Sequence, residues 1–303
     1  MTWYIIFNPA AGGGCAEKQW PAIERTLQDL GIAYSIHYTT RRGHATELVY
    51  EALRKGYTHL LGMGGDGTNH EIVNGIMTHA QGRTHDVHYA LLPIGTGNDW
   101  ARMYDLPADP AQRLRRLLQP QTVLQDIGLV RYHAEGEMRE RYFVNVAGMA
   151  YDGYIGQQLQ AHPVTNRVHY LLSVVKYLFQ YQLSKARIEF DGHTAEDLFY
   201  TINIGLCKYS GGGMQLVPQA IGDDGLFALT FARSLSKWEV LLQTRRFYDG
   251  SLLRHPRVEG HQARSIRVLH TEERPTLLEA DGEFLGHTPA EFHLLEKALR
   301  VVI

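Results

Sequence analysis

Short apolar runs alternate with helical spacings of apolar residues through the N-terminal third of the chain. The apolar runs predict strands at 3–7, 34–38, 58–61 and 89–92. The segments between them predict helices, for example 69–78, where apolar residues fall on one face. A regular strand–helix alternation is typical of a parallel sheet with helices on both faces. We therefore predict an N-terminal α/β domain.

The pattern changes near Asp126. One more helix is expected from Asp109-Pro110, because aspartate suits an N-cap and proline suits the first helical turn. Beyond it, alternating apolar and polar residues predict half-buried antiparallel strands, at 122–132, 141–146, 186–190, 198–204, 226–232, 265–269 and 276–279. Helical patterns at 166–182 and 236–249 interrupt these strands.

These patterns predict two domains with ligands expected in the cleft between them. The first is an α/β domain over 1–125, which a C-terminal strand at 290–303 could complete. The second is a β-rich, sandwich-like domain over 126–289. The length of 303 residues fits this division, since domains average roughly 150 residues.

Charge and cysteine content exclude several classes of protein. Thirty Lys and Arg against 32 Asp and Glu give a net charge of -2, so no nucleic-acid partner is expected. Cys15 and Cys207 lie far apart in the sequence, as suits a reducing cytosol. The N-terminus resembles no signal peptide, and the longest apolar stretch, 168–179, is too short to span a bilayer. We expect a protein that can touch a membrane without crossing it.

The glycine-rich segment 62–68 follows a predicted strand and opens a predicted helix, so its backbone N–H groups can face an anion. Gly64, Gly65 and Gly67 allow a ligand to approach the backbone closely. Thr68 and Glu71 have the spacing of a capping box. Asp66 would repel a bare pyrophosphate, which favours a magnesium-bound nucleotide.

Other interpretations of this segment are weaker. It matches G-x-G-x-x-G at Gly62, Gly64 and Gly67, but Asp86 precedes the next strand, whereas a dinucleotide site needs its acidic residue after that strand. The glycines could also form tight turns only. Similar polar turns at 8–14 and 93–99 favour a shared phosphate site, and no P-loop sequence is present.

Five segments, taken in order, resemble the motifs of the diacylglycerol kinase catalytic domain family, and of its soluble bacterial lipid kinases in particular. They are NPAAG at 8–12, GGDGT at 64–68, GTGNDWAR at 95–102, GGGM through PQA to DDG at 211–225, and EADGE at 279–283. The resemblance covers essentially the whole chain. GGDGT is shared with NAD kinases and phosphofructokinases, whereas the third and fourth segments together are much more specific.

The resemblance implies roles for individual residues. The residues expected to bind ATP are Asn8, Thr39 or its neighbour Thr40, Gly64, Gly65, Asp66, Gly67, Thr68 and Thr96. Asp66 and Asp99 would organise the catalytic Mg²⁺. A further, structural Mg²⁺ would be held by Asp224 and the carbonyls of Ile221 and Leu226, and Asp281 would be the general base. One departure is Ala150, where relatives often have glycine after Asn145-Val146-Ala147-Gly148, so a loop on the lipid side is expected to differ in shape.

The function that the resemblance implies is that of an ATP-dependent lipid kinase, cytoplasmic and peripherally associated with the inner face of the membrane. Its expected acceptor is diacylglycerol, giving phosphatidic acid. A kinase of a soluble substrate such as NAD and a nucleotide-binding module without turnover are the alternatives, and a homodimer is left open. The apolar residues of 170–179 are interpreted as core, with a membrane-interface role as the second interpretation because Lys176, Lys185 and Arg187 flank them.

Overall fold

A computed structural model describes residues 1–95, 97–162 and 167–303. The chain forms two compact units, Met1–Ile127 with Glu296–Ile303, and Gly128–Leu295. The last strand, β16 (Glu283–Val302), contributes residues to both units. The predicted fold class, an α/β unit followed by a β-rich unit, is confirmed.

The first unit contains a parallel sheet in the order β2–β1–β3–β4, and the end of β16 pairs in parallel with β4. The strands are β1 (Thr2–Phe7), β2 (Ala33–Tyr38), β3 (His59–Gly64) and β4 (His88–Pro93). The helices are α1 (Ala11–Asp29), α2 (His44–Arg54), α3 (Asp66–His79), α4 (Asp99–Met103) and α5 (Pro110–Arg116), with a 3₁₀ turn at Thr84–Asp86.

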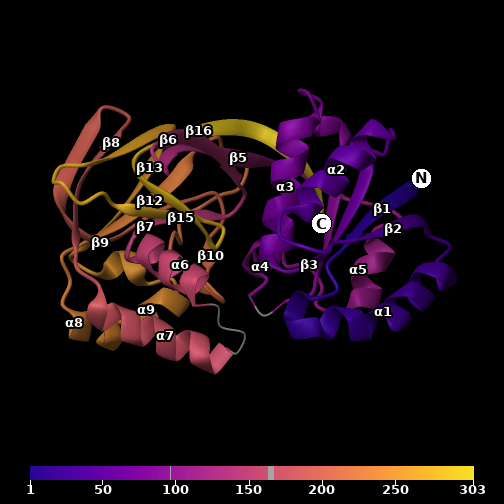
Figure 1. Ribbon diagram of the computed structural model, residues 1–303, viewed down its shortest axis with the longest axis horizontal. Helices are drawn as coiled ribbons and strands as arrows, with labels where there is room; N and C mark the ends of the chain where they lie inside the picture. The colour runs from indigo at the N-terminus through magenta and orange to yellow at the C-terminus, as the bar shows by residue number, and fades with distance from the viewer. Residues whose placement is uncertain (96, 163–166) are drawn as a thin grey trace. The chain divides into compact units, whose positions relative to one another are not determined.

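Helices cover both faces of this parallel sheet (Figure 1), so most residues of β1, β3 and β4 are buried. The edge strand β2 is only half-buried. Trp3, Ile5 and Phe7 pack in one cluster with residues of α1 and α5. Helices α2 and α3 pack against each other on the opposite face. Because β1 lies between β2 and β3, the chain crosses over β1 on its way from β2 to β3. The loops after β1 and β3 thus flank the point where the strand order reverses, the usual ligand position in such sheets.

The second unit is antiparallel. Its strands are β5 (Thr122–Ala134, begun in the first unit), β6 (Glu137–Phe143), β7 (Val146–Ala150), β8 (Ser184–Phe190), β9 (His193–Gly205), β10 (Tyr209–Ser210), β11 (Met214–Gln215), β12 (Phe227–Arg233), β13 (Val258–Ala263), β14 (Ser265–His270) and β15 (Leu277–Ala280). In its sheet the hydrogen-bonded strands follow the order β13–β12–β9–β7–β15–β16. Phe143, Phe199, Phe227, Phe231 and Phe292 anchor its core.

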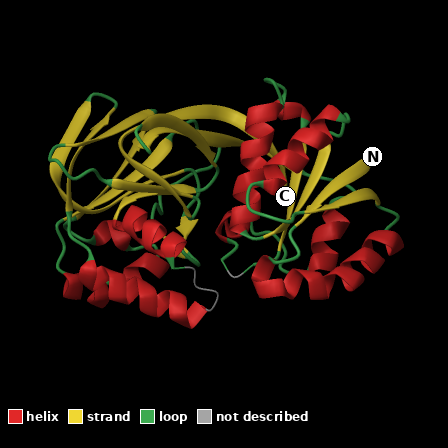
Figure 2. Cartoon of the chain, in the orientation of Figure 1, coloured by secondary structure: helices red, strands yellow, loops and turns green. Residues whose placement is uncertain are grey.

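Helices of the second unit gather on one side of its strands (Figure 2). They are α6 (Tyr151–Ala161), α7 (Arg167–Gln180), α8 (Lys237–Leu242) and α9 (Thr244–Tyr248), followed by a 3₁₀ turn at Leu252–Arg254. The predicted helix 236–249 is therefore two short helices. The predicted strand 141–146 is also wrong in detail, because the chain leaves β6 at Phe143 and starts β7 at Val146.

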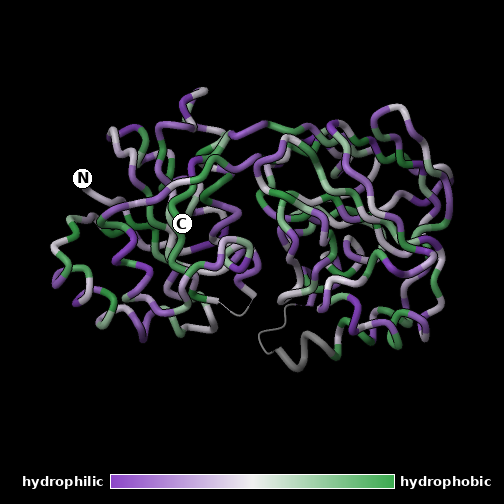
Figure 3. The backbone as a smooth tube through the Cα atoms, turned by 180° about the vertical axis from the view of Figure 1, so that it is seen from behind, coloured by the Kyte–Doolittle hydropathy of each residue, from purple (hydrophilic) through white to green (hydrophobic). Residues whose placement is uncertain are grey.

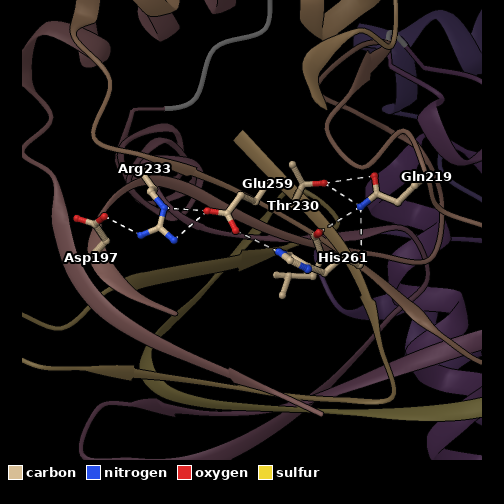
Figure 4. A network of polar contacts seen from close by, with 7 residues as sticks. Asp197, Gln219, Thr230, Arg233, Glu259 and His261 are labelled. Carbon is tan, nitrogen blue, oxygen red and sulfur yellow. Dashed lines mark hydrogen bonds and ion pairs between the residues drawn. The ribbon is translucent and has the colours of Figure 1, made fainter. Parts of the chain in front are cut away.

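A polar network crosses β9, β12 and β13 (Figure 4). Arg233 bridges Asp197 and Glu259, with nitrogen–oxygen distances of 2.8 Å to each. These two carboxylates raise the pKa of Arg233. The Gln219 amide nitrogen donates to the Thr230 hydroxyl and the Leu229 carbonyl, both over 3.1 Å. Gln219 thereby fixes the PQA part of the motif at 211–225 to the sheet.

Candidate functional site

The first unit brings the predicted ATP residues to the carboxyl edge of its sheet. Asn8 follows β1, Thr39 follows β2, Gly65 follows β3, and 94–98 follow β4. Carboxyl ends of parallel strands share one edge, so loops widely separated in sequence lie together. Thr96 lies outside the described residues.

A hydrogen bond between Asn8 and Thr68 connects the loop after β1 to the first turn of α3. The Asn8 amide nitrogen donates to the Thr68 hydroxyl over 3.0 Å, and its oxygen accepts the N–H of Ala10 over 3.1 Å. Thr68 is buried in the first turn of α3. These bonds fix the loop after β1 against the start of the helix whose N-terminus would face the phosphates.

The predicted capping box is wrong. Helix α3 begins at Asp66, and its N-cap is Gly65 in an extended conformation. Thr68 therefore lies inside the helix. The Glu71 carboxylate accepts the N–H groups of Gly43 over 2.7 Å and Ala45 over 3.1 Å instead. It caps the start of the neighbouring helix α2, which the spacing in the sequence could not reveal.

Gly64 and Gly65, between β3 and α3, differ in whether the surrounding packing leaves room for a larger side chain. A Cβ at Gly64 would lie 2.4 Å from the Thr68 hydroxyl, so no larger residue fits there. A Cβ at Gly65 would meet only the Gly95 Cα at 3.6 Å and the Ile94 carbonyl at 3.7 Å, which are ordinary contacts. Packing within the protein therefore requires glycine at 64 but not at 65.

The carboxylates of Asp66 and Asp99 converge on Gly97. A Cβ at Gly97 would lie 2.7 Å from Oδ2 of Asp66 and 3.6 Å from Oδ2 of Asp99. Asp99 is buried at the start of α4, with the Arg102 guanidinium 4.0 Å away. Two carboxylates around a space that one added carbon would fill suit a hard divalent cation such as Mg²⁺.

The two candidate threonines after β2 differ in their contacts. The N–H of Thr39 donates to the Phe7 carbonyl over 2.8 Å, continuing the pairing of β1 and β2. The hydroxyl and the N–H of Thr40 both lie 3.1 Å from Nδ1 of His44. Thr40 thus already contacts the start of α2, and the assignment of the nucleotide contact to Thr39 stays a prediction.

A pocket of about 860 Å³ lies beside these loops within the first unit. It reaches from Gly12, Gly95 and Gly97 to α1 and to the start of α5, where Gln19 and Ala111 line it. The loops after β1 and β4 thus have a cavity on their α1 side.

In the second unit, Asp281 anchors the corner between β6 and β7. Its carboxylate accepts the N–H groups of Val144 over 3.0 Å, Asn145 over 2.9 Å and Val146 over 3.2 Å. Both carboxylate oxygens are engaged, so the side chain has one fixed orientation. These bonds also explain why the predicted strand 141–146 breaks at Val144 and Asn145. The general-base role of Asp281 stays a prediction.

Asp224 lies in the turn before β12. Its Oδ1 accepts the N–H of Leu226 over 3.1 Å, and its Oδ2 accepts the Gln262 amide over 3.2 Å. Among the described residues, no three His, Cys, Asp or Glu side chains cluster in a way that could hold a metal. A cation here would depend on Asp224 and on carbonyls such as those of Ile221 and Leu226, and this metal site stays a prediction.

The sequence analysis missed a buried pair of carboxylates, Asp152 and Glu279. Burial raises the pKa of Asp152 to about 6, although hydrogen bonds from Thr201 and Asn203 oppose the shift. Burial, and next the Asp152 charge, raise the pKa of Glu279 well above its usual value. The Glu279 carboxylate accepts the N–H of Gly282 over 2.7 Å, beside Asp281. Raised carboxyl pKa values beside a predicted catalytic residue are typical of functional sites.

Glycines make room for this pair. A Cβ at Gly148 would lie 2.5 Å from Oε1 of Glu279, and one at Gly153 would lie 2.3 Å from the Leu277 carbonyl. Helix α6 therefore packs directly on β15. The only signal in the sequence was Glu279 itself, the first acidic residue of EADGE, whose burial the pattern of residues does not predict.

Ala150 has a backbone conformation that favours glycine, with φ 65° and ψ −112°. It is the residue immediately before α6, and its side chain is buried. The chain thus keeps a positive φ at this position in spite of the alanine, at a cost in strain.

Comparison with known proteins agrees with this geometry. Residues 2–130 match the diacylglycerol kinase catalytic domain, and residues 145–303 match the YegS C-terminal NAD kinase beta sandwich-like domain. The chain belongs to the diacylglycerol kinase catalytic domain family. A diacylglycerol kinase of Staphylococcus carnosus is 29% identical over 299 residues, covering 98% of this chain and 93% of the relative. One of Staphylococcus haemolyticus is 29% identical over 302 residues, covering 98% of this chain and 86% of the relative.

Solved structures support the fold assignment. A crystal structure of a putative diacylglycerol kinase from Bacillus anthracis matches with a TM-score of 0.76 and 23% identity, covering 99% of this chain and 96% of the other. Membership of this kinase family implies ATP as the phosphoryl donor. Among the described residues, no helix has the length and apolar character needed to cross a membrane.

Proposed function

We propose that this member of the diacylglycerol kinase catalytic domain family transfers the γ-phosphoryl group of Mg–ATP to the free hydroxyl of diacylglycerol, giving phosphatidic acid and ADP. The observation that carries the proposal is the convergence of Asp66 and Asp99 on Gly97, next to a helix N-terminus. The relatives named diacylglycerol kinase support the choice of acceptor.

The first unit would hold the donor. Amides of the first turn of α3 would contact the phosphates, since the first N–H groups of a helix have no partner within it. Asp66 and Asp99 would hold Mg²⁺, which when bound neutralises charge on the transferring phosphoryl group. Asn8 keeps the loop after β1 in place through Thr68.

The second unit would handle the acceptor. The hydroxyl oxygen of the lipid attacks the γ-phosphorus, the bond from that phosphorus to the β–γ bridging oxygen breaks, and the hydroxyl proton passes to a base. Asp281 is the proposed base. Glu279 would keep the Asp281-Gly282 turn in place through its bond to the Gly282 N–H.

The test is a transfer assay with γ-labelled ATP on purified protein, offering detergent-dispersed diacylglycerol or NAD, with the product identified by mass. We expect labelled phosphatidic acid with wild type and with Glu17→Gln, an exposed control, and none with Asp66→Asn. Labelled NADP would favour a soluble acceptor, in line with the NAD kinase-like description of the C-terminal domain. Nucleotide binding without transfer to either acceptor would favour a non-catalytic module.

A further inference from the structure

Two helices of the second unit expose large apolar side chains side by side. On α7, Leu172, Val175 and Phe179 are exposed by 62%, 40% and 42%, and on α8 Trp238 and Leu242 are exposed by 67% and 81%. The Phe179 and Trp238 rings are in edge-to-face contact, with centroids 5.5 Å apart. We call these five residues the apolar patch. Soluble proteins seldom expose such contiguous apolar surface without a binding role.

Helix α7 therefore carries two apolar faces. Tyr177 and Leu178 are buried against the rest of the unit, whereas Leu172, Val175 and Phe179 recur at i, i+3 and i+7 on the exposed side. The interpretation of 170–179 as core is thus right for Leu178 and wrong for Val175 and Phe179. An ordinary surface helix has polar residues at such positions. Side chains before Leu172 on this helix lie outside the described residues.

The charges near the apolar patch are mostly positive. The sequence contains no Asp or Glu between Asp152 and Glu189, and the segment 234–258 contains five Lys and Arg but two acidic residues. Lys176 is exposed on α7, and the Lys237 ammonium contacts the Phe179 carbonyl at the junction of the two helices. Arg245 of α9 has 92% of its side chain exposed and lies 3.6 Å from Asp249 in an exposed ion pair. The whole chain has a net charge of -2, so this local excess of cations is specific to the region.

We propose that the apolar patch docks this protein onto an anionic lipid bilayer. Figure 3 shows hydrophobic and hydrophilic residues intermixed along the chain. Helices that lie in a membrane interface place apolar residues on one face and cationic residues beside them. Apolar side chains would enter the headgroup region while Lys176, Lys237 and Arg245 contact anionic headgroups. Trp238 suits the boundary between the two, where tryptophan is enriched.

A second copy of the chain is a poorer occupant. A symmetric contact through the apolar patch would bring the same cations of both copies together, and like charges opposed across an interface are unfavourable. The bilayer is the occupant with both an apolar interior and an opposite surface charge. The inference rests on the proposed function, which needs a water-insoluble acceptor, but its evidence comes from other residues.

Vesicle binding of the full chain tests the proposal directly. We compare vesicles of phosphatidylcholine alone with vesicles that also contain phosphatidylglycerol, at low and high salt. We expect binding to the anionic vesicles, weakened by salt, and a blue shift of tryptophan fluorescence. Trp3 and Trp100 are each exposed by only 1%, and Trp20 is half-buried against Phe7 and Tyr34. Trp238 is the largely exposed tryptophan, so the shift should disappear in Trp238→Phe.

The patch variant Trp238→Ser/Leu242→Ser is matched by Leu118→Ser/Met138→Ser, whose residues are exposed by 51% and 56% and belong to other elements than α7 and α8. We expect the patch variant to lose at least about tenfold in vesicle affinity, and the control to lose none. Equal vesicle affinity of the two variants would overturn the proposal, as would a patch variant that only dissociates a dimer. A native circular dichroism spectrum for both variants confirms folding.

Activity separates this proposal from the proposed function. The ratio of turnover on vesicle-borne diacylglycerol to turnover on a short-chain, water-soluble diacylglycerol should fall at least about tenfold in the patch variant. Vesicle binding through the apolar patch without any lipid phosphorylation would overturn the proposed function alone. Lipid phosphorylation with an unchanged ratio would overturn the docking surface alone.

Discussion

The Asn8 amide nitrogen donates to the Thr68 hydroxyl over 3.0 Å, across 60 residues of sequence. The bond joins the loop after β1 to the first turn of α3, which follows the neighbouring strand β3. Thr68 is thereby held against Gly64, where a Cβ would lie 2.4 Å from its hydroxyl. Packing against Thr68 therefore requires glycine at 64, whereas packing does not require glycine at the next position, Gly65.

Gly65→Ala and Gly64→Ala should therefore fail in different ways. Gly65→Ala meets only ordinary contacts and has φ −95°, so we expect a melting temperature near wild type but at least about tenfold weaker ATP binding. Gly64→Ala should lose stability by about 1–3 kcal/mol because it forces Thr68 to move. Thermal denaturation and nucleotide titration of both variants check this. Normal ATP affinity in a folded Gly65→Ala would contradict the phosphate site.

Asp281→Asn should lower turnover by at least about 10²-fold if Asp281 is the base. Asparagine cannot accept all three backbone N–H groups of 144–146 that the carboxylate binds, so we also expect a loss of about 1–3 kcal/mol in the free energy of unfolding. Rate per folded molecule, measured with urea denaturation of the same sample, separates the two effects. A folded variant that turns over lipid at the wild-type rate would place the base elsewhere.

Asp152 should make the protein less stable as the pH rises. Burial raises the pKa of its carboxyl to about 6, so the folded state holds the proton more tightly than the unfolded chain does. The free energy of unfolding then falls between about pH 4 and pH 6, and the loss persists above that range. Asp152→Asn should reduce this dependence without abolishing it, because burial alone raises the pKa of Glu279 in the same direction. It should also stabilise the protein at pH 8 by about 2 kcal/mol. Urea denaturation from pH 4 to pH 8 tests it, with the exposed Asp29→Asn as the unchanged control.

Ala150→Gly should stabilise the protein. The alanine has φ 65° and ψ −112°, which costs on the order of 1–3 kcal/mol for a residue with a Cβ. Glycine removes this strain, although its freedom in the unfolded chain takes back about 0.5–1 kcal/mol. We expect a net gain of about 1 kcal/mol in the free energy of unfolding, measured by urea denaturation. Ala147→Gly, in the middle of the same strand β7, should destabilise instead. A loss in both variants would argue against strain at 150.

The sequence by itself determined the α/β unit and the place of its site. Apolar runs followed by glycine turns define a parallel sheet, and in such a sheet the turns after β1, β3 and β4 must share an edge. That reasoning already placed Asn8, Gly65 and Asp99 together. It needs only local patterns and one rule of sheet geometry.

Only the tertiary structure decided which partners the side chains have. Glu71 caps α2 because α2 and α3 pack together, although its spacing from Thr68 suggested a capping box. Asp152 and Glu279 form a buried pair because α6 packs through its glycines on β15. The Phe179 and Trp238 rings are in contact although they belong to different helices. Lys237, next to Trp238, is 58 residues from Phe179 in the sequence and contacts its carbonyl. Burial and long-range contacts arise from packing between elements. The residue pattern of one helix or strand shows which face is apolar but not which element packs against that face.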